Sequence, residues 1–202
     1  MLFQTFDDKQ QCALVYQDKK FFNDLQGLSL SHTWGYAPYL KHGDIEYAQI
    51  WVSGSSLVET CPTFLKDELN IIEKKMRGIF RSCHETHLDL DDVCFYELMP
   101  TWLIRDYANI KDRICTHVFE NYTKPSNCDH MLKVIKVITE IKQQPLELAL
   151  RQIKGTGLRE KNFLRSIKNS TRRISYDPFK TKTGRLATAP LSFPVLTVPK
   201  EY

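Results

Sequence analysis

The sequence lacks any apolar run of the roughly 20 residues that a helix needs to cross a bilayer. It also lacks the basic start and apolar stretch of a signal peptide, because it opens MLFQTFDDKQQ, with acids at positions 7 and 8. We therefore expect a cytoplasmic protein. Its 202 residues are enough for one large domain or two small ones. We find no internal repeat and no low-complexity tract.

The cysteines contain no CxxC pair, which argues against a zinc ribbon or a thioredoxin-type redox site. Without a secretory context, their even number does not indicate a set of disulfides. We expect reduced thiols, several of them buried as small apolar side chains. The six positions are Cys12, Cys61, Cys83, Cys94, Cys115 and Cys128.

One local cluster offers ligands of the types that zinc accepts: Cys83, His84 and His87, followed by Asp89, Asp91 and Asp92. No second ligand pair stands at zinc-site spacing from it. We interpret the cluster as an exposed polar connection and expect no metal or other cofactor in this chain.

Charge is unevenly distributed along the chain. Residues 151–202 contain 12 basic and 3 acidic side chains, a net charge of +9, whereas residues 1–150 contain 16 basic and 21 acidic side chains, a net charge of −5. Such asymmetry indicates a contact with a polyanion at the basic end. A solvated basic tail would have the same composition, so composition alone leaves both interpretations open.

We predict an α+β fold with three regions. Region 1–59 is β-rich, with a hairpin over Leu2–Phe6 and Cys12–Tyr16 and a strand over Tyr47–Val52. Region 60–170 is helical, because apolar residues recur there at steps of three and four, as in the buried seam of a helical bundle. Region 171–202 is extended, because its prolines exclude a long helix.

The helices of the central region are expected to begin near Thr60, Pro100, Pro125 and Pro145, with a basic helix over residues 158–168. The buried stripe of the first helix consists of Leu65, Leu69, Ile72, Met76 and Ile79; that of the second consists of Leu103, Tyr107, Ile110, Ile114 and Val118.

The segment 172–199, RRISYDPFKTKTGRLATAPLSFPVLTVP, carries the clearest functional signal. Gly184 allows the backbone to approach a partner closely or to take a positive φ. Arg185 projects a planar fork of donors suited to phosphate oxygens or to acceptors on base edges. The basic residues Arg172, Arg173, Lys180 and Lys182 are interleaved with aromatic and hydroxyl side chains, a mixture suited to a nucleic-acid backbone.

The order of strand, threonine-rich connection and Thr183-Gly184-Arg185-Leu186 resembles the first palm motif of family A (DNA polymerase I-type) DNA polymerases. The resemblance covers about the last thirty residues most specifically and extends back to about position 125. It implies that Arg185 contacts the primer–template duplex from the minor groove near the primer terminus, and that Thr183 and Gly184 shape the loop. Minor-groove acceptors occur in every base pair, so such a contact requires no particular sequence.

The bacterial members follow this motif with an asparagine- and glutamine-rich stretch that ends in Ile-Pro. Residues 187–197 lack those amides, and in this they resemble virus-type divergent members, so we assign no DNA contact to Ser192. The resemblance also makes the preceding basic helix part of a thumb that grips the duplex. Its expected phosphate contacts are Lys161, Arg165 and Lys168, together with Lys154.

The resemblance places the aspartates that hold two magnesium ions in later palm motifs, beyond Tyr202. We therefore expect this chain alone to bind DNA without incorporating nucleotides, in a bacterial or virus-infected cell. A continuing chain or a separately encoded catalytic part would complete a magnesium-dependent DNA polymerase. The alternative is a free-standing DNA-binding accessory protein. Many members of the resembled family carry an N-terminal proofreading exonuclease with a D-x-E signature on its first strand. Lys9 stands where the second acid would be needed, so we expect no exonuclease activity and interpret region 1–59 as a degenerate exonuclease-like or an unrelated domain.

Overall fold

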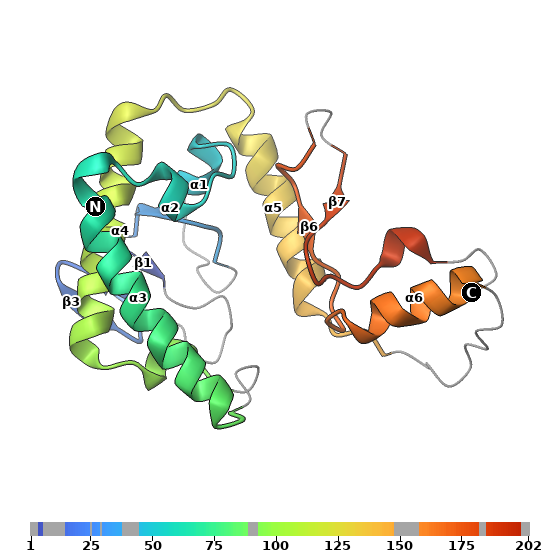
Figure 1. Ribbon diagram of the computed structural model, residues 1–202. Helices are drawn as coiled ribbons and strands as arrows, with labels where there is room; N and C mark the ends of the chain where they lie inside the picture. Colours follow the sequence, from blue (N-terminus) through green and yellow to red (C-terminus); the bar gives the residue numbers. More distant parts are fainter. Residues whose placement is uncertain are drawn as a thin grey trace. The chain divides into compact units, whose positions relative to one another are not determined.

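The computed structural model describes residues 4–5, 15–24, 26–28, 30–37, 45–88, 93–147, 158–181 and 185–198. The chain forms two compact units, unit 1 (Met1–Cys128) and unit 2 (Asp129–Tyr202), and its class is α+β, as predicted (Figure 1). This division falls inside the range 60–170 that the sequence predicted as one helical region. The charge follows it: unit 1 has 13 basic and 18 acidic residues, a net charge of −5, and unit 2 has 15 and 6, a net charge of +9.

Unit 1 contains a small antiparallel sheet in the order β1 (Gln4–Thr5), β2 (Val15–Gln17) and β3 (Lys20–Phe22). The pairing of β1 with β2 confirms the predicted N-terminal hairpin. Two further short strands, β4 (His32–Thr33) and β5 (Glu46–Tyr47), pair in parallel.

The predicted strand over Tyr47–Val52 is wrong, because β5 ends at Tyr47 and α1 (Ala48–Trp51) follows at once. Ala48 and Val52 are buried against Cys115 and Val118, which are one turn apart on a single helix. A helical turn brings residues i and i+4 within about 6 Å along the axis, whereas a strand would separate them by about 13 Å. Only the helix lets both side chains reach this pair.

Three helices complete unit 1: α2 (Leu57–Thr60), α3 (Thr63–Glu85) and α4 (Thr101–Asn121), with a 3₁₀ turn, η2 (Phe95–Leu98), before α4. Ser56 and Glu59 form a capping box that begins α2. The long helices α3 and α4 pack against each other and run in opposite directions (Figure 1). The predicted stripes belong to this core except for Val118, which packs with Ala48 and Val52. The buried core residues of these two helices include Leu65, Leu69, Ile72, Leu103, Ile104, Ala108, Ile110 and Ile114.

The cysteines of the described residues are mostly outside disulfides. Cys61, Cys115 and Cys128 are buried thiols, and Cys83 is a half-buried one. Cys94 is disulfide-bonded, so the prediction of reduced thiols is wrong at this position. A disulfide requires two Cα atoms within about 7 Å of each other in the fold, which the spacing of cysteines in the sequence does not reveal.

The described residues of unit 2 form two helices and a short hairpin. The helices are α5 (Cys128–Gln143) and α6 (Leu158–Lys168), and the strands β6 (Tyr176–Asp177) and β7 (Ala187–Thr188) pair antiparallel. A 3₁₀ turn, η4 (Val195–Thr197), follows. Phe163, Ile167 and Phe193 form the core, covered by Leu146, Ile174, Val195 and Val198.

The helix predicted from Pro145 does not begin there, because residues 145–147 are not helical, and residues 148–157 lie outside the described residues. No helix in the described part of the chain combines the length and the apolar character that a membrane span requires.

Candidate nucleic-acid interface

The segment 171–175 is the backbone spine of unit 2. On one side the carbonyl of Arg172 accepts a hydrogen bond from the Leu146 amide at 2.7 Å. On the other side the segment pairs with the returning chain: the Phe193 amide donates to Arg173 O at 3.0 Å, and the Ala189 amide donates to Ser175 O at 2.9 Å. The spine therefore fixes the base of the β6–β7 hairpin, on which the predicted site residues lie.

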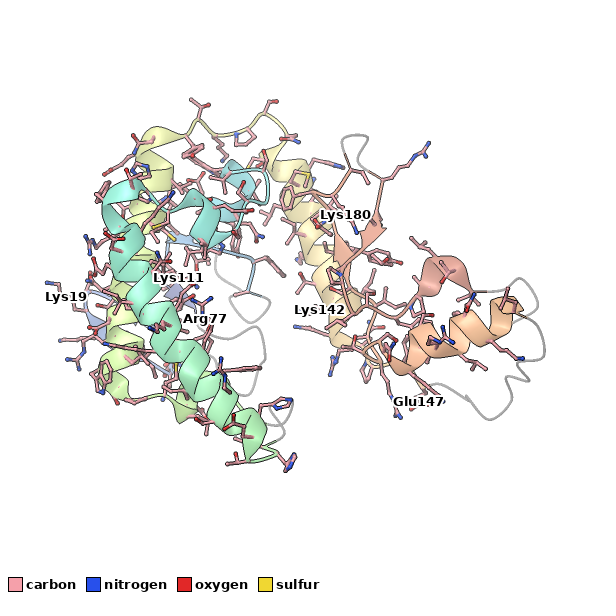
Figure 2. All side chains as sticks on the ribbon, viewed as in Figure 1. Lys19, Arg77, Lys111, Lys142, Glu147 and Lys180 are labelled. Carbon is pink, nitrogen blue, oxygen red and sulfur yellow. The ribbon has the colours of Figure 1, made fainter. Side chains whose placement is uncertain are left out.

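The hairpin loop is closed by its own side chains. Asp177 Oδ1 accepts a hydrogen bond from the Phe179 amide at 2.9 Å, which starts the turn. Thr181 Oγ1 donates to Arg185 O at 2.7 Å. Lys180, which is labelled in Figure 2, donates from Nζ to Thr188 O at 3.4 Å. These contacts hold the backbone of Arg185 to the opposite side of the loop, while its side chain is exposed.

Lys182, Thr183 and Gly184 lie outside the described residues, as does Lys154. The roles expected for them therefore stay predictions. The described part of the motif is Arg185 and Leu186, both exposed just before β7.

The solvent face of α6 carries a basic row. Lys161, Arg165 and Lys168 stand at i, i+4 and i+7 and are all exposed, and the buried Phe163 and Ile167 lie on the opposite face. The row spans about 10 Å of helix axis. A DNA strand has one phosphate per 3.4 Å of axis, so about three phosphates fall within this length. Three of the four predicted thumb residues thus lie along one exposed face of α6.

Arg173 makes hydrogen bonds within unit 2 that could not be predicted from its position in the sequence. Its Nη1 donates to the carbonyl of Gln143 at 2.6 Å and to that of Lys142 at 3.2 Å. These are the last two residues of α5, where helix carbonyls lack intrahelical partners and the dipole favours a cation. We therefore expect Arg173 to position the segment 171–175 through its hydrogen bonds to α5. Arg172 is exposed and stays a predicted phosphate contact.

Replacing Arg173 with alanine should destabilise unit 2 by about 1 kcal/mol, because the end of α5 loses a charged donor. Hydrogen exchange should quicken in the last turn of α5, and Arg173→Lys, which keeps the charge, should restore part of the protection. DNA affinity should fall with an unchanged slope of log K against log salt. A slope reduced by about one, with α5 unaffected, would instead identify Arg173 as a phosphate contact.

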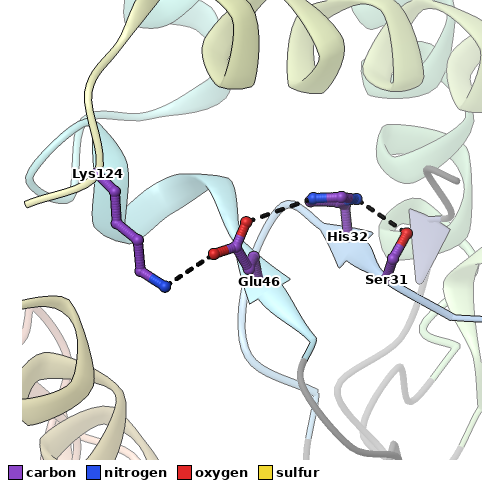
Figure 3. Close-up of polar contacts among 4 residues, drawn as sticks. All are labelled: Ser31, His32, Glu46 and Lys124. Carbon is purple, nitrogen blue, oxygen red and sulfur yellow. Dashed lines mark hydrogen bonds and ion pairs between the residues drawn. The ribbon is translucent and has the colours of Figure 1, made fainter.

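A polar cluster among the described residues of unit 1 joins segments distant in sequence (Figure 3). Glu46 on β5 lies 2.9 Å from Lys124 Nζ through one carboxylate oxygen and 3.4 Å from His32 Nε2 through the other. The second ring nitrogen of His32, Nδ1, lies 2.9 Å from Ser31 Oγ, and the ring packs against Phe119. Both oxygens of Glu46 are thus engaged, and the cluster ties β4 and β5 to the segment after α4.

Next to this cluster, burial raises the pKa of Tyr47 to about 12, with a smaller contribution from Tyr36. The phenol is therefore neutral at physiological pH and packs as a core side chain. No three His, Cys, Asp or Glu side chains converge on a metal-sized site within the described ranges, which include Cys83, His84 and His87. Asp89, Asp91 and Asp92 lie outside those ranges.

Comparisons with protein-family models, with curated proteins and with solved structures found no match to this chain.

Proposed function

We propose that unit 2 binds the primer–template duplex in DNA replication, as the thumb and first palm segment of a family A DNA-directed DNA polymerase. The observation that carries the proposal is the exposed Arg185 on a loop closed by Thr181, in the same unit as the basic row of α6. The resemblance of residues 183–186 to the first palm motif supports the polymerase assignment.

The chemistry of these side chains favours binding without sequence preference. Contacts from lysine and arginine to phosphates carry no sequence information and make the affinity depend on salt. Arg185 adds a planar donor that suits the acceptors present in the minor groove of every base pair. A basic helical face together with one exposed arginine is therefore suited to any duplex.

In this proposal the chain holds the duplex, and another part of the polymerase carries out the chemistry. The resemblance assigns magnesium binding to aspartates of later palm motifs, supplied by a continuing chain or a separate catalytic subunit. We assign no magnesium-dependent step to the residues of this chain.

A free-standing DNA-binding accessory protein is the second candidate. The concentration of positive charge in unit 2, which has a core of its own, is what favours it. The two functions differ in their preference for DNA ends. A polymerase portion should bind a recessed primer–template more tightly than a blunt duplex of equal length, whereas an accessory protein should bind the two equally.

The Arg185→Ala variant tests the proposal directly. Loss of the guanidinium should weaken binding of a fluorescent primer–template by roughly tenfold, the size of effect expected for a well-placed arginine contact. Fluorescence anisotropy at fixed salt would measure it.

The matched control is Lys74→Ala, which removes one exposed charge from α3 in unit 1. Lys124 is unsuitable as a control because it pairs with Glu46. Equal weakening by Arg185→Ala and Lys74→Ala would contradict the assignment of Arg185 as a specific contact.

A further inference from the structure

Leu191 has an unusual combination of backbone conformation and exposure. Its φ is +62°, and 70% of its surface is accessible. A left-handed conformation is an outlier for a bulky side chain and costs free energy that the surrounding structure must offset. An exposed leucine gains little by burial within the chain that would offset this cost.

The conformation arises from a type II turn over residues 189–192. The Ser192 amide donates to Ala189 O at 3.2 Å, Pro190 occupies the second position, and Leu191 occupies the third. Pro190 has a fixed negative φ, and the third position of a type II turn requires a positive φ, so glycine or asparagine is the usual residue there. The turn thus carries a leucine where glycine would fit without strain.

The backbone of Leu191 is held firmly even though its side chain is free of burial. Its carbonyl accepts hydrogen bonds from the Thr171 amide at 2.7 Å and from Thr171 Oγ1 at 3.1 Å. The next residue, Ser192, is buried, and its Oγ accepts a hydrogen bond from the Ser175 amide at 2.9 Å. The hydrogen bonds therefore fix the backbone of this turn, and the apolar side chain of Leu191 is exposed to solvent.

The basic residues near this turn indicate which kind of partner the Leu191 side chain contacts. Thr171, which holds Leu191, lies between the exposed Lys168 at the end of α6 and the exposed Arg172. Arg172 directly follows Thr171, whose amide and hydroxyl hold the Leu191 carbonyl, so a partner here must accept positive charge close to an apolar contact. The minor groove of duplex DNA offers this combination, because two rows of phosphates flank the apolar faces of sugars and base edges, and proteins insert leucine there.

We propose that Leu191 packs into the minor groove of the duplex bound by unit 2, close to phosphate contacts made by Arg172 and Lys168. The inference rests on the proposed function. It adds an apolar contact that the basic residues do not supply, and it accounts for a leucine at a position that favours glycine.

The Leu191→Gly variant separates the contact from the fold. Glycine relieves the strained φ, so the melting temperature of unit 2 should stay the same or rise by a few degrees. Removal of the side chain should nevertheless weaken duplex binding by about fivefold, which corresponds to roughly 40 Å² of apolar surface removed from water in the groove. The slope of log K against log salt should not change, because no charge is removed.

Leu191→Ala is the companion variant, since it removes the side chain and keeps the strain; it should lose the same affinity without the gain in melting temperature. Unchanged duplex affinity in both variants would overturn this inference and leave the proposed function standing. If the unsubstituted protein does not bind duplex, the proposed function fails and this inference fails with it.

Discussion

Replacing Leu69 with alanine should lower the free energy of unfolding of unit 1 by about 2–5 kcal/mol. Leu69 is 1% exposed and belongs to the core between α3 and α4. Truncation removes most of a fully buried side chain and leaves a cavity that the two long helices can close only in part. Chemical denaturation followed by circular dichroism would measure the loss.

Ile71→Ala is the matched control, because Ile71 lies on the same helix and is 58% exposed. Its effect should stay within about 0.5 kcal/mol. The comparison tests the orientation of α3, since a rotation of the helix by about 160° would exchange the two positions. Equal losses, or a larger loss at Ile71, would contradict the packing described for unit 1.

The α3 and α4 stripes could be predicted because burial on one face of a long helix repeats every three to four residues. Leu65, Leu69 and Ile72 lie in the core as their spacing indicates. The segment 47–52 could not be assigned in the same way. A short apolar run fits a strand and a single helical turn equally well, and the distinction depended on Cys115 and Val118, more than sixty residues further along the chain.

The candidate site shows the same contrast. The basic row of α6 is readable from the sequence, because Lys161, Arg165 and Lys168 share a helical face at a fixed spacing. The hydrogen bonds from Arg173 to the end of α5 could not be predicted from the sequence, since they depend on a contact between residues 30 apart. For Leu191 the sequence contains a local signal, because a proline at position 190 is compatible with the second position of a type II turn over residues 189–192. The exposure of its side chain required the fold.

The largest effect on DNA binding should come from the triple variant Lys161→Ala, Arg165→Ala and Lys168→Ala. Each side chain that neutralises one phosphate contributes about 0.9 to the slope of log K against log salt. Removal of all three should therefore make the slope shallower by about 2.7. At low salt the affinity should fall by roughly two orders of magnitude, because three fewer counterions are released on binding. The fold should tolerate the change, since all three side chains are exposed.

A triple variant of α3 provides a control of equal charge. Lys66, Lys74 and Arg81 are also exposed side chains on one side of a helix, α3, in the acidic unit 1. Their replacement by alanine lowers the net charge of the protein by the same three units without touching unit 2. Under the proposed function the salt slope changes only in the α6 variant, because counterion release depends on local phosphate contacts. If both variants change the slope equally, binding reflects the total charge of the protein, and α6 is not the surface that holds the duplex.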